Sequence, residues 1–77
     1  ALALELASRG VTVNAVAPGI IAGSATEAVF DAAAIKTLVP MRRAGTPDEV
    51  ADLVGFLASE QAAYLTGQII GLNGGIV

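Results

Sequence analysis

The residues best placed to contact a ligand are the four that follow an apolar segment: Pro18, Gly19, Ile20 and Ile21. The preceding segment, Val11–Ala17, carries apolar or small residues on both faces, which is typical of a strand covered on both sides in a parallel sheet. Pro18 has no backbone N–H and is expected to end the ladder. Gly19 allows another backbone or a ligand to come close. Ligands of open α/β sheets bind just beyond such strand ends, so these four residues form a candidate ligand edge.

Groups that could carry out catalysis are scarce in this chain. The one phenol, Tyr64, would need a nearby cation to donate a proton near neutral pH. The residue one helical turn on is Gln68, and Lys36 is distant in sequence, so Tyr64 is interpreted as structural. With no His and no Cys, the chain has no Ser-His-Asp triad, no His-ligated metal and no thiolate. It also lacks a G-x-G-x-x-G turn, and we predict no catalytic and no metal-binding residue in it.

The composition points to a segment that needs partners. Of the 77 residues, 55% are hydrophobic and 14% charged, against ~25% charged in ordinary soluble domains. A chain this short cannot hide so much apolar surface by itself, so we expect it to be a piece of a larger subunit, with a missing upstream part. A net charge of −3 argues against nucleic acid as a partner. The uncharged runs fall short of a membrane span, and a cytoplasmic setting is the expectation.

Helix signals surround the candidate edge. Ala1–Arg9 is predicted to be the end of a helix, closed by Gly10, and is either a core helix or one packed between a sheet and another subunit. Ser24 begins a capping-box pattern for a short helix to about Phe30, and Asp31 caps a second over Ala32–Val39. This pair of helices is either an ordinary connection or a lid over a substrate.

The strongest local signal is the capping box at Thr46-Pro47-Asp48-Glu49. It predicts a helix to about Ser59-Glu60 with an apolar face and a second stripe of small residues. Gln68–Leu72 is predicted to be a second buried strand, and Asn73-Gly74-Gly75 turns the chain away. Strand, helices and strand make a βαβ-like unit, so the two strands are expected to be parallel.

Three motifs, in this order and spacing, add a resemblance that covers nearly the whole chain: V-T-V-N-A-V-A-P-G-I-I, G-T-P-D-E-V-A-D-L-V-G-F-L-A-S and A-A-Y-L-T-G-Q-I-I-G-L-N-G-G. Together they resemble the C-terminal third of the short-chain dehydrogenase/reductase family. Within it, the pieces A-S-R-G-V-T-V-N and A-A-Y-L-T-G are most similar to 3-oxoacyl-acyl-carrier-protein reductases. The resemblance implies a doubly wound Rossmann sheet that binds NAD or NADP, of which residues 1–77 would supply the last two strands and their flanking helices.

The resemblance also implies roles for individual residues. Pro18 and Gly19 match the motif that faces the nicotinamide, and Ile21 matches a residue whose backbone bonds the carboxamide. A Thr that the family often has is Gly23 here, followed by Ser24. Ser24–Val39 matches the substrate loop. Arg9 matches a basic residue that could dock an acidic carrier protein, although a lone surface Arg also suits the end of a helix.

The family's Gly-rich loop and its catalytic Ser, Tyr and Lys are absent from these residues, so the chain alone is expected to be inactive. The predicted function is a segment of a reductase that converts the carbonyl of a small or acyl-carrier-bound substrate to a hydroxyl. The segment would supply a nicotinamide-site wall, the substrate loop and the interface of a dimer or tetramer. The alternatives are a non-catalytic assembly fragment, or a dehydrogenase of the same family that acts on a sugar, steroid or small alcohol.

Overall fold

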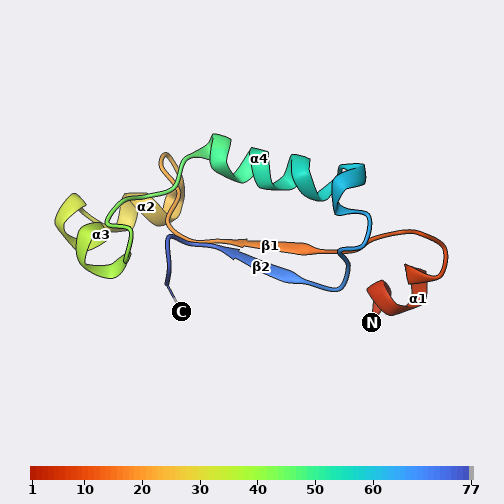
Figure 1. Cartoon of the computed structure of the whole chain (residues 1–77). Coiled ribbons are helices and arrows are strands. Elements are labelled where there is room, and N and C mark those ends of the chain that lie inside the picture. The colour runs from red at the N-terminus through yellow and green to blue at the C-terminus, as the bar shows by residue number, and fades with distance from the viewer. Residues whose placement is uncertain (77) are drawn as a thin grey trace.

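The computed structural model describes residues 1–76 and shows a two-stranded sheet flanked by short helices (Figure 1). The elements in chain order are α1 (Leu2–Ala7), β1 (Ala15–Pro18), α2 (Ala25–Val29), α3 (Ala32–Leu38), α4 (Pro47–Leu57), the 3-10 helix η1 (Glu60–Ala62) and β2 (Ile69–Leu72). The molecule is elongated, 47 × 22 × 20 Å. Helices α2 and α3 lie at the end where both strands finish, and α1 lies at the opposite end.

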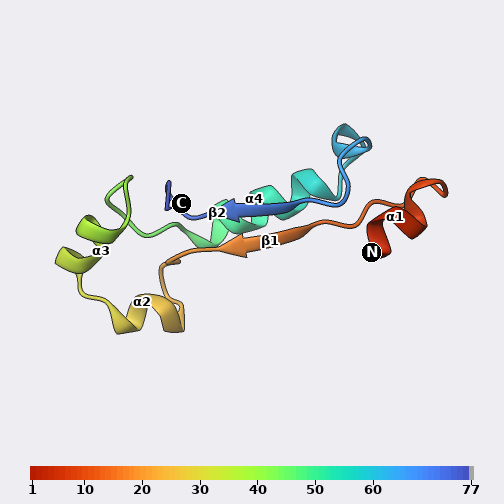
Figure 2. The same cartoon turned by 90° about the horizontal axis from the view of Figure 1, so that it is seen from below.

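The two strands are parallel, as predicted, and pair from Ala15↔Ile69 to Pro18↔Leu72. Helix α4 runs along one face of this sheet in both views (Figure 2). Val16 faces α4 and is half-buried, whereas Ala15 on the other face is exposed and Ile69 is 79% exposed. Residues 1–76 therefore cover only one face of the strands, and coverage of the second face stays a prediction. An apolar strand pattern shows what a strand tolerates on each face, not what is present to cover it.

Both strands are shorter at the start than predicted. In place of Val11–Ala17 the first strand begins at Ala15, and in place of Gln68–Leu72 the second begins at Ile69. Before the strands begin, side-chain and backbone hydrogen bonds alternate between the two segments. The Val13 N–H donates to Thr66 Oγ1 at 2.9 Å and the Gln68 N–H donates to Asn14 Oδ1 at 3.1 Å, whereas the Gly67 N–H donates to the Val13 carbonyl at 2.8 Å.

The end of β1 also differs by one residue from the prediction. Pro18 belongs to the strand and pairs with Leu72. Proline has no backbone N–H to donate. It is tolerated there because the hydrogen bond to the Leu72 carbonyl comes from the next residue, the Gly19 N–H, at 2.9 Å. Proline therefore marks the last residue of the ladder rather than the first residue beyond it.

The predicted helices are present, with ends that differ from the prediction by at most three residues. Ser24 Oγ accepts from the Glu27 N–H, as in a capping box, but the Glu27 carboxylate accepts from the Gly23 N–H instead of that of Ser24. Asp31 caps α3 through the Ala34 N–H. The chain leaves α4 at Leu57, earlier than Ser59-Glu60, and turns through η1.

The hydrophobic core lies beside the ends of the strands and not between the sheet and α4. Its buried members are Ile20, Ile35 and Val39, with Phe30 and Ala44 packed against them. This cluster joins the candidate edge to α3. Among residues 1–76, no helix combines the length and the apolar character that crossing a bilayer would require.

So small a core predicts the behaviour of the 77-residue chain by itself. Because one sheet face and both strand edges are open, we expect the isolated chain to be molten or aggregated. It should bind the dye ANS strongly and give a poorly dispersed ¹H–¹⁵N spectrum. A monomer with sharp, well-dispersed resonances and no dye binding would contradict this expectation.

Candidate functional site

The predicted edge begins where β1 and β2 end side by side. Gly19 packs against the residue that follows β2: a Cβ placed on Gly19 would lie 2.8 Å from Asn73 Cβ and 3.0 Å from Asn73 Cα. Glycine is therefore required by the approach of this chain's own backbone, which confirms the predicted close approach at Gly19. Pro18 beside it is exposed.

Ile20 and Ile21 have different roles. The Ile20 side chain is 8% exposed and belongs to the core, so only its backbone could reach a ligand. Ile21 forms a parallel bridge with Gly45, made by the Gly45 N–H to the Ile20 carbonyl (2.9 Å) and the Ala22 N–H to the Gly45 carbonyl (2.8 Å). In this pattern the amide of Ile21 points away from Gly45, and it donates no hydrogen bond within residues 1–76. The predicted edge thus holds a spare backbone donor.

The segment that resembles a substrate loop leaves the edge at Ala22. Gly23, which stands where the family often has Thr, has a φ of 79°, a conformation that favours glycine. The next hydroxyl, on Ser24, accepts the N-cap hydrogen bond of α2. Gly23 supplies no hydroxyl, and the Ser24 oxygen already serves as the cap acceptor of α2.

The same segment returns to the strand ends at Met41. The Met41 N–H donates to the Gly74 carbonyl at 3.0 Å, and a Cβ on Gly74 would lie 2.6 Å from Val39 Cγ1. Gly74 has a φ of 66°, so its conformation and the available space both require glycine. The turn after β2 was predicted only to lead the chain away from the sheet. It also packs against the residues that follow α3.

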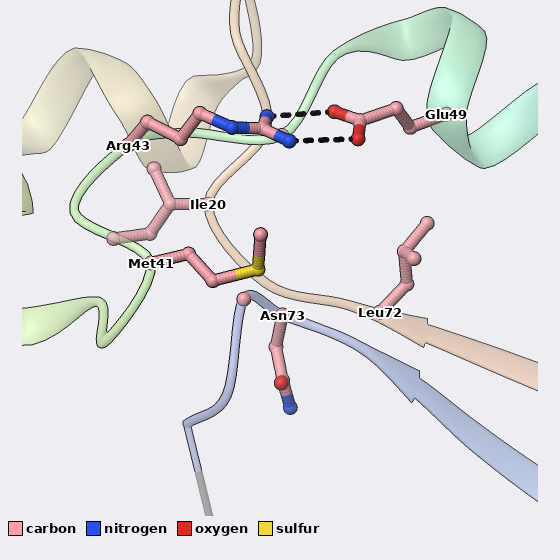
Figure 3. A pocket seen from close by; sticks show the side chains of 8 residues that line it. Ile20, Met41, Arg43, Glu49, Leu72 and Asn73 are labelled. Atoms are coloured by element: carbon pink, nitrogen blue, oxygen red, sulfur yellow. Dashed lines mark hydrogen bonds and ion pairs between the residues drawn. The ribbon is translucent and has the colours of Figure 1, made fainter.

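An ion pair that the sequence analysis missed closes this region. Arg43 NH1 and NH2 donate to Glu49 Oε1 and Oε2 at 2.8 and 2.9 Å, as Figure 3 shows. Glu49 Oε1 also accepts from the Thr46 N–H at 2.9 Å, which completes the predicted capping box. The pair borders a cavity of about 80 Å³ lined by Ile20, Met41, Arg43, Gly45, Glu49, Leu72, Asn73 and Gly74. The sequence signal that could have predicted this ion pair is Arg43, a basic residue six positions before the capping-box residue Glu49.

The ion pair shifts the pKa of both groups. The hydrogen bonds from Arg43 and from the Thr46 backbone lower the pKa of Glu49 from 4.5 to about 2, and Glu49 raises the pKa of Arg43. Because the pKa of Glu49 is lower in the folded state, its contribution to stability is present above pH 4.5 and is lost as the pH falls towards 2. The side chains are 49% and 41% exposed, so solvent and salt weaken this contribution.

The remaining candidates lie outside this cluster. Tyr64 is fully exposed near η1, whereas Lys36 is on α3 at the opposite end of the molecule. Arg9 is exposed beyond α1, far from the strand ends. Among the described residues, no three His, Cys, Asp or Glu side chains gather as a metal site would need.

Comparisons with known proteins show the family of this chain. All of residues 1–77 match the family described as Enoyl-(Acyl carrier protein) reductase. The chain is 52% identical over 77 residues to the 3-oxoacyl-[acyl-carrier-protein] reductase FabG of Vibrio cholerae, covering 97% of this chain and 32% of that protein. It is 50% identical to Nodulation protein G of Azospirillum brasilense, covering 99% of this chain and 32% of that one. The chain belongs to the short-chain dehydrogenase/reductase family.

A solved structure of this family has the same fold. YwfH, an NADPH-dependent reductase involved in bacilysin biosynthesis, superposes with a TM-score of 0.87 at 36% identity over 99% of this chain and 34% of its own. This short-chain dehydrogenase/reductase segment thus spans about a third of the length of the relatives it matches. The assignment of Pro18, Gly19, Ile20 and Ile21 to a cofactor stays a prediction.

The capping box of α4 gives a stability prediction for the full-length protein that carries this short-chain dehydrogenase/reductase segment. Thr46→Ala removes the acceptor of the Glu49 N–H and should cost ~1 kcal/mol of unfolding free energy. Thr26→Ala, on exposed α2, is the matched control and should change stability much less. Denaturant unfolding measures both. A large rise in the Kd of nicotinamide cofactor for Thr46→Ala, with unchanged stability, would place Thr46 in the site instead.

Proposed function

We propose that the chain is a segment of an NAD(P)H-dependent carbonyl reductase in which Pro18, Gly19, Ile20 and Ile21 form a wall of the nicotinamide site. Residues 1–77 would then be part of one NAD(P)-binding Rossmann domain. The relatives' names supply the chemistry: a 3-oxoacyl-[acyl-carrier-protein] reductase at 52% identity and an NADPH-dependent reductase at 36%.

The observation that carries the proposal is the backbone of Ile21. Its amide lies at the carboxyl ends of two parallel strands and donates no hydrogen bond within residues 1–76. A carboxamide oxygen is a suitable acceptor for such a donor. Gly19 lies at the same strand end, where Asn73 occupies the space that a side chain would need, so a ring would have to approach the Gly19 backbone from another side.

The residues present fit a nicotinamide cofactor, which when bound would supply the hydride for reduction of a carbonyl. The part played by this chain is to orient the ring. The Ile21 amide would hold the carboxamide, and the backbone at Pro18 and Gly19 would face the ring. Proton donation falls outside these residues, since Tyr64 and Lys36 are at opposite ends of the molecule. The geometry gives no preference between NAD and NADP.

The substrate we favour is a 3-oxoacyl thioester, either free or carried by an acyl-carrier protein. Ser24–Val39 would cover it, since this segment is anchored to the site at both of its ends, by the Ala22–Gly45 and Met41–Gly74 hydrogen bonds. Another ketone or alcohol is the rival substrate class, because YwfH serves a different biosynthesis. A cytoplasmic location stays a prediction.

The same protein is proposed to be a homodimer or tetramer. The support is apolar surface that residues 1–76 leave open: Leu4 is 81% exposed and Ile69 is 79% exposed. Surface of this character needs a cover, which the rest of the subunit and a second subunit would share.

The direct test uses the full-length protein that carries this chain, supplied with acetoacetyl thioester and NADH or NADPH. Loss of absorbance at the reduced nicotinamide band would support the proposal, and a panel of sugar, steroid and small ketone substrates separates the rival class. The isolated 77-residue chain serves as the control and should show no turnover. Absence of both cofactor binding and turnover in the full-length protein would contradict the proposal.

The wall itself is tested by a graded series in the full-length protein. Gly19→Val should be the worst variant, with kcat/KM reduced on the order of a hundredfold, because it displaces the strand end by an ångström or more. Ile21→Ala should be milder, since the proposed contact is made by its backbone. Gly55→Ala should be nearly neutral, because nothing lies within 4 Å of a Cβ there.

The clash of Gly19→Val with Asn73 requires a check on folding. Circular dichroism and the melting temperature should therefore accompany kcat/KM for all three variants. A Gly19→Val enzyme that folds and keeps full activity would reduce Pro18-Gly19 to a strand terminator.

A further inference from the structure

We propose that Arg43 and Glu49 are positioning residues that hold the Ile20–Ala22 backbone in the conformation that presents the Ile21 amide. The inference rests on the proposed function, because it takes that amide as the contact to nicotinamide. Neither side chain is proposed to touch the cofactor. Their action passes through the backbone of Ala44 and Gly45, in three steps.

In the first step, the Glu49 carboxylate fixes the guanidinium. Two parallel hydrogen bonds of 2.8 and 2.9 Å make a bidentate pair, the geometry in which arginine is held most firmly. The carboxylate is itself fixed by the Thr46 N–H at the start of α4. Arg43 is thereby anchored to the eleven-residue helix α4, the longest element in residues 1–76.

In the second step, the guanidinium fixes the backbone that bridges to the wall. Arg43 NH1 donates to the Ala44 carbonyl at 3.0 Å as well as to Glu49. The next residue, Gly45, makes both hydrogen bonds of the bridge to Ile20 and Ala22. A Cβ on Gly45 would lie 3.0 Å from Ile21 Cδ1, so the Ile21 side chain also rests on this backbone. A shift of residues 43–45 therefore moves Ile21.

In the third step, the backbone next to Arg43 shows why the Arg43–Glu49 pair is needed to hold residues 43–45. Arg42 has a φ of 66°, a left-handed conformation that is costly for a side-chain-bearing residue and persists only when its neighbours enforce it. The Arg42 N–H itself donates to the Val39 carbonyl at 2.7 Å, and the constraints on either side of Arg42 are the Met41–Gly74 hydrogen bond and the Arg43–Glu49 pair. Packing gives less help, because a cavity of about 80 Å³ lies under the pair. Release of Arg43 would let the strained turn relax.

The test compares the Kd of the whole cofactor with the Kd of its ADP-ribose part in the Glu49→Gln variant of the full-length protein. Glutamine keeps the Oε1 oxygen, which accepts from the Thr46 N–H and from Arg43 NH1, but it places an NH₂ donor where Oε2 accepts from Arg43 NH2. The cap therefore survives, while the charge and one of the two hydrogen bonds of the pair are lost. We expect the Kd of the reduced cofactor and kcat/KM to worsen about tenfold, less than the loss for a full 1 Å misplacement. The Kd of the ADP-ribose part of the cofactor, which lacks nicotinamide, should stay unchanged.

Three comparison variants separate positioning from stability. Thr46→Ala removes the cap but not the pair, and should lower the melting temperature without changing the ratio of the two dissociation constants. Asp48→Asn and Arg42→Gln remove a neighbouring charge of each sign and should leave the ratio unchanged.

Arg43→Gln should reproduce the effect of Glu49→Gln, and the double variant should be no worse than either single one, because the residues act as a pair.

The outcomes distinguish this inference from the function on which it rests. A wild-type protein that binds no nicotinamide cofactor overturns both. A wild-type protein that binds it, with Glu49→Gln unchanged or weakened equally for cofactor and ADP-ribose, overturns the positioning role alone. A selective loss of nicotinamide affinity in both single variants supports the positioning role.

Discussion

The structure depends on the clamp that Asn14 makes at the start of the sheet. Its amide donates to the Leu65 carbonyl at 2.9 Å and its oxygen accepts from the Gln68 N–H at 3.1 Å, across separations of 51 and 54 residues. Thr66 adds a third contact through the Val13 N–H. A strand pair of four residues has little pairing energy of its own, and a slip of one residue would turn every side chain to the other face. These side-chain bonds therefore set the register that brings Gly19 and Asn73 together at the far end.

The far end is held by a different kind of contact. Ile20, Ile35 and Val39 form the buried cluster there, so apolar packing fixes α3 against the end of β1. Backbone hydrogen bonds through Gly45 and Gly74 then tie the excursion of residues 22–42 at both ends. Polar bonds specify the start of the sheet and apolar burial specifies its end. The middle of the sheet, by contrast, has one face open to solvent.

Much of this was accessible from the sequence, and the failures have physical causes. The capping pattern at Thr46 located the start of α4 because a cap is a local interaction among four residues. The strand starts were misplaced because side-chain bonds from Asn14 and Thr66 interrupt the regular backbone pairing there. A partner residue about fifty positions away leaves no periodic signal in the sequence. The Arg43–Glu49 ion pair was missed because Glu49 was already explained as part of a capping box, so a second partner was not sought. At the edge itself, glycine at 19 was predicted to permit a close approach, and Asn73 makes it.

The candidate site is built from backbone groups, which explains why side-chain chemistry gave so little information about it. Ile21 offers an amide, Ile20 turns its side chain into the core, and Gly19 offers the absence of a side chain. Apart from proline, which lacks the N–H, every residue carries the same backbone groups, so their usefulness depends on where the chain holds them. The informative positions are then the ones that hold the backbone: the glycines at 19, 45 and 74, where a Cβ would lie within 3.0 Å of a neighbour, and the charged pair beside them. In a site made of backbone groups, the residues whose identity matters are those that hold the backbone in place. In this chain Glu49 is such a residue, because its hydrogen bonds link α4 to Arg43, and residues 43–45 lead to the bridge at Ile21.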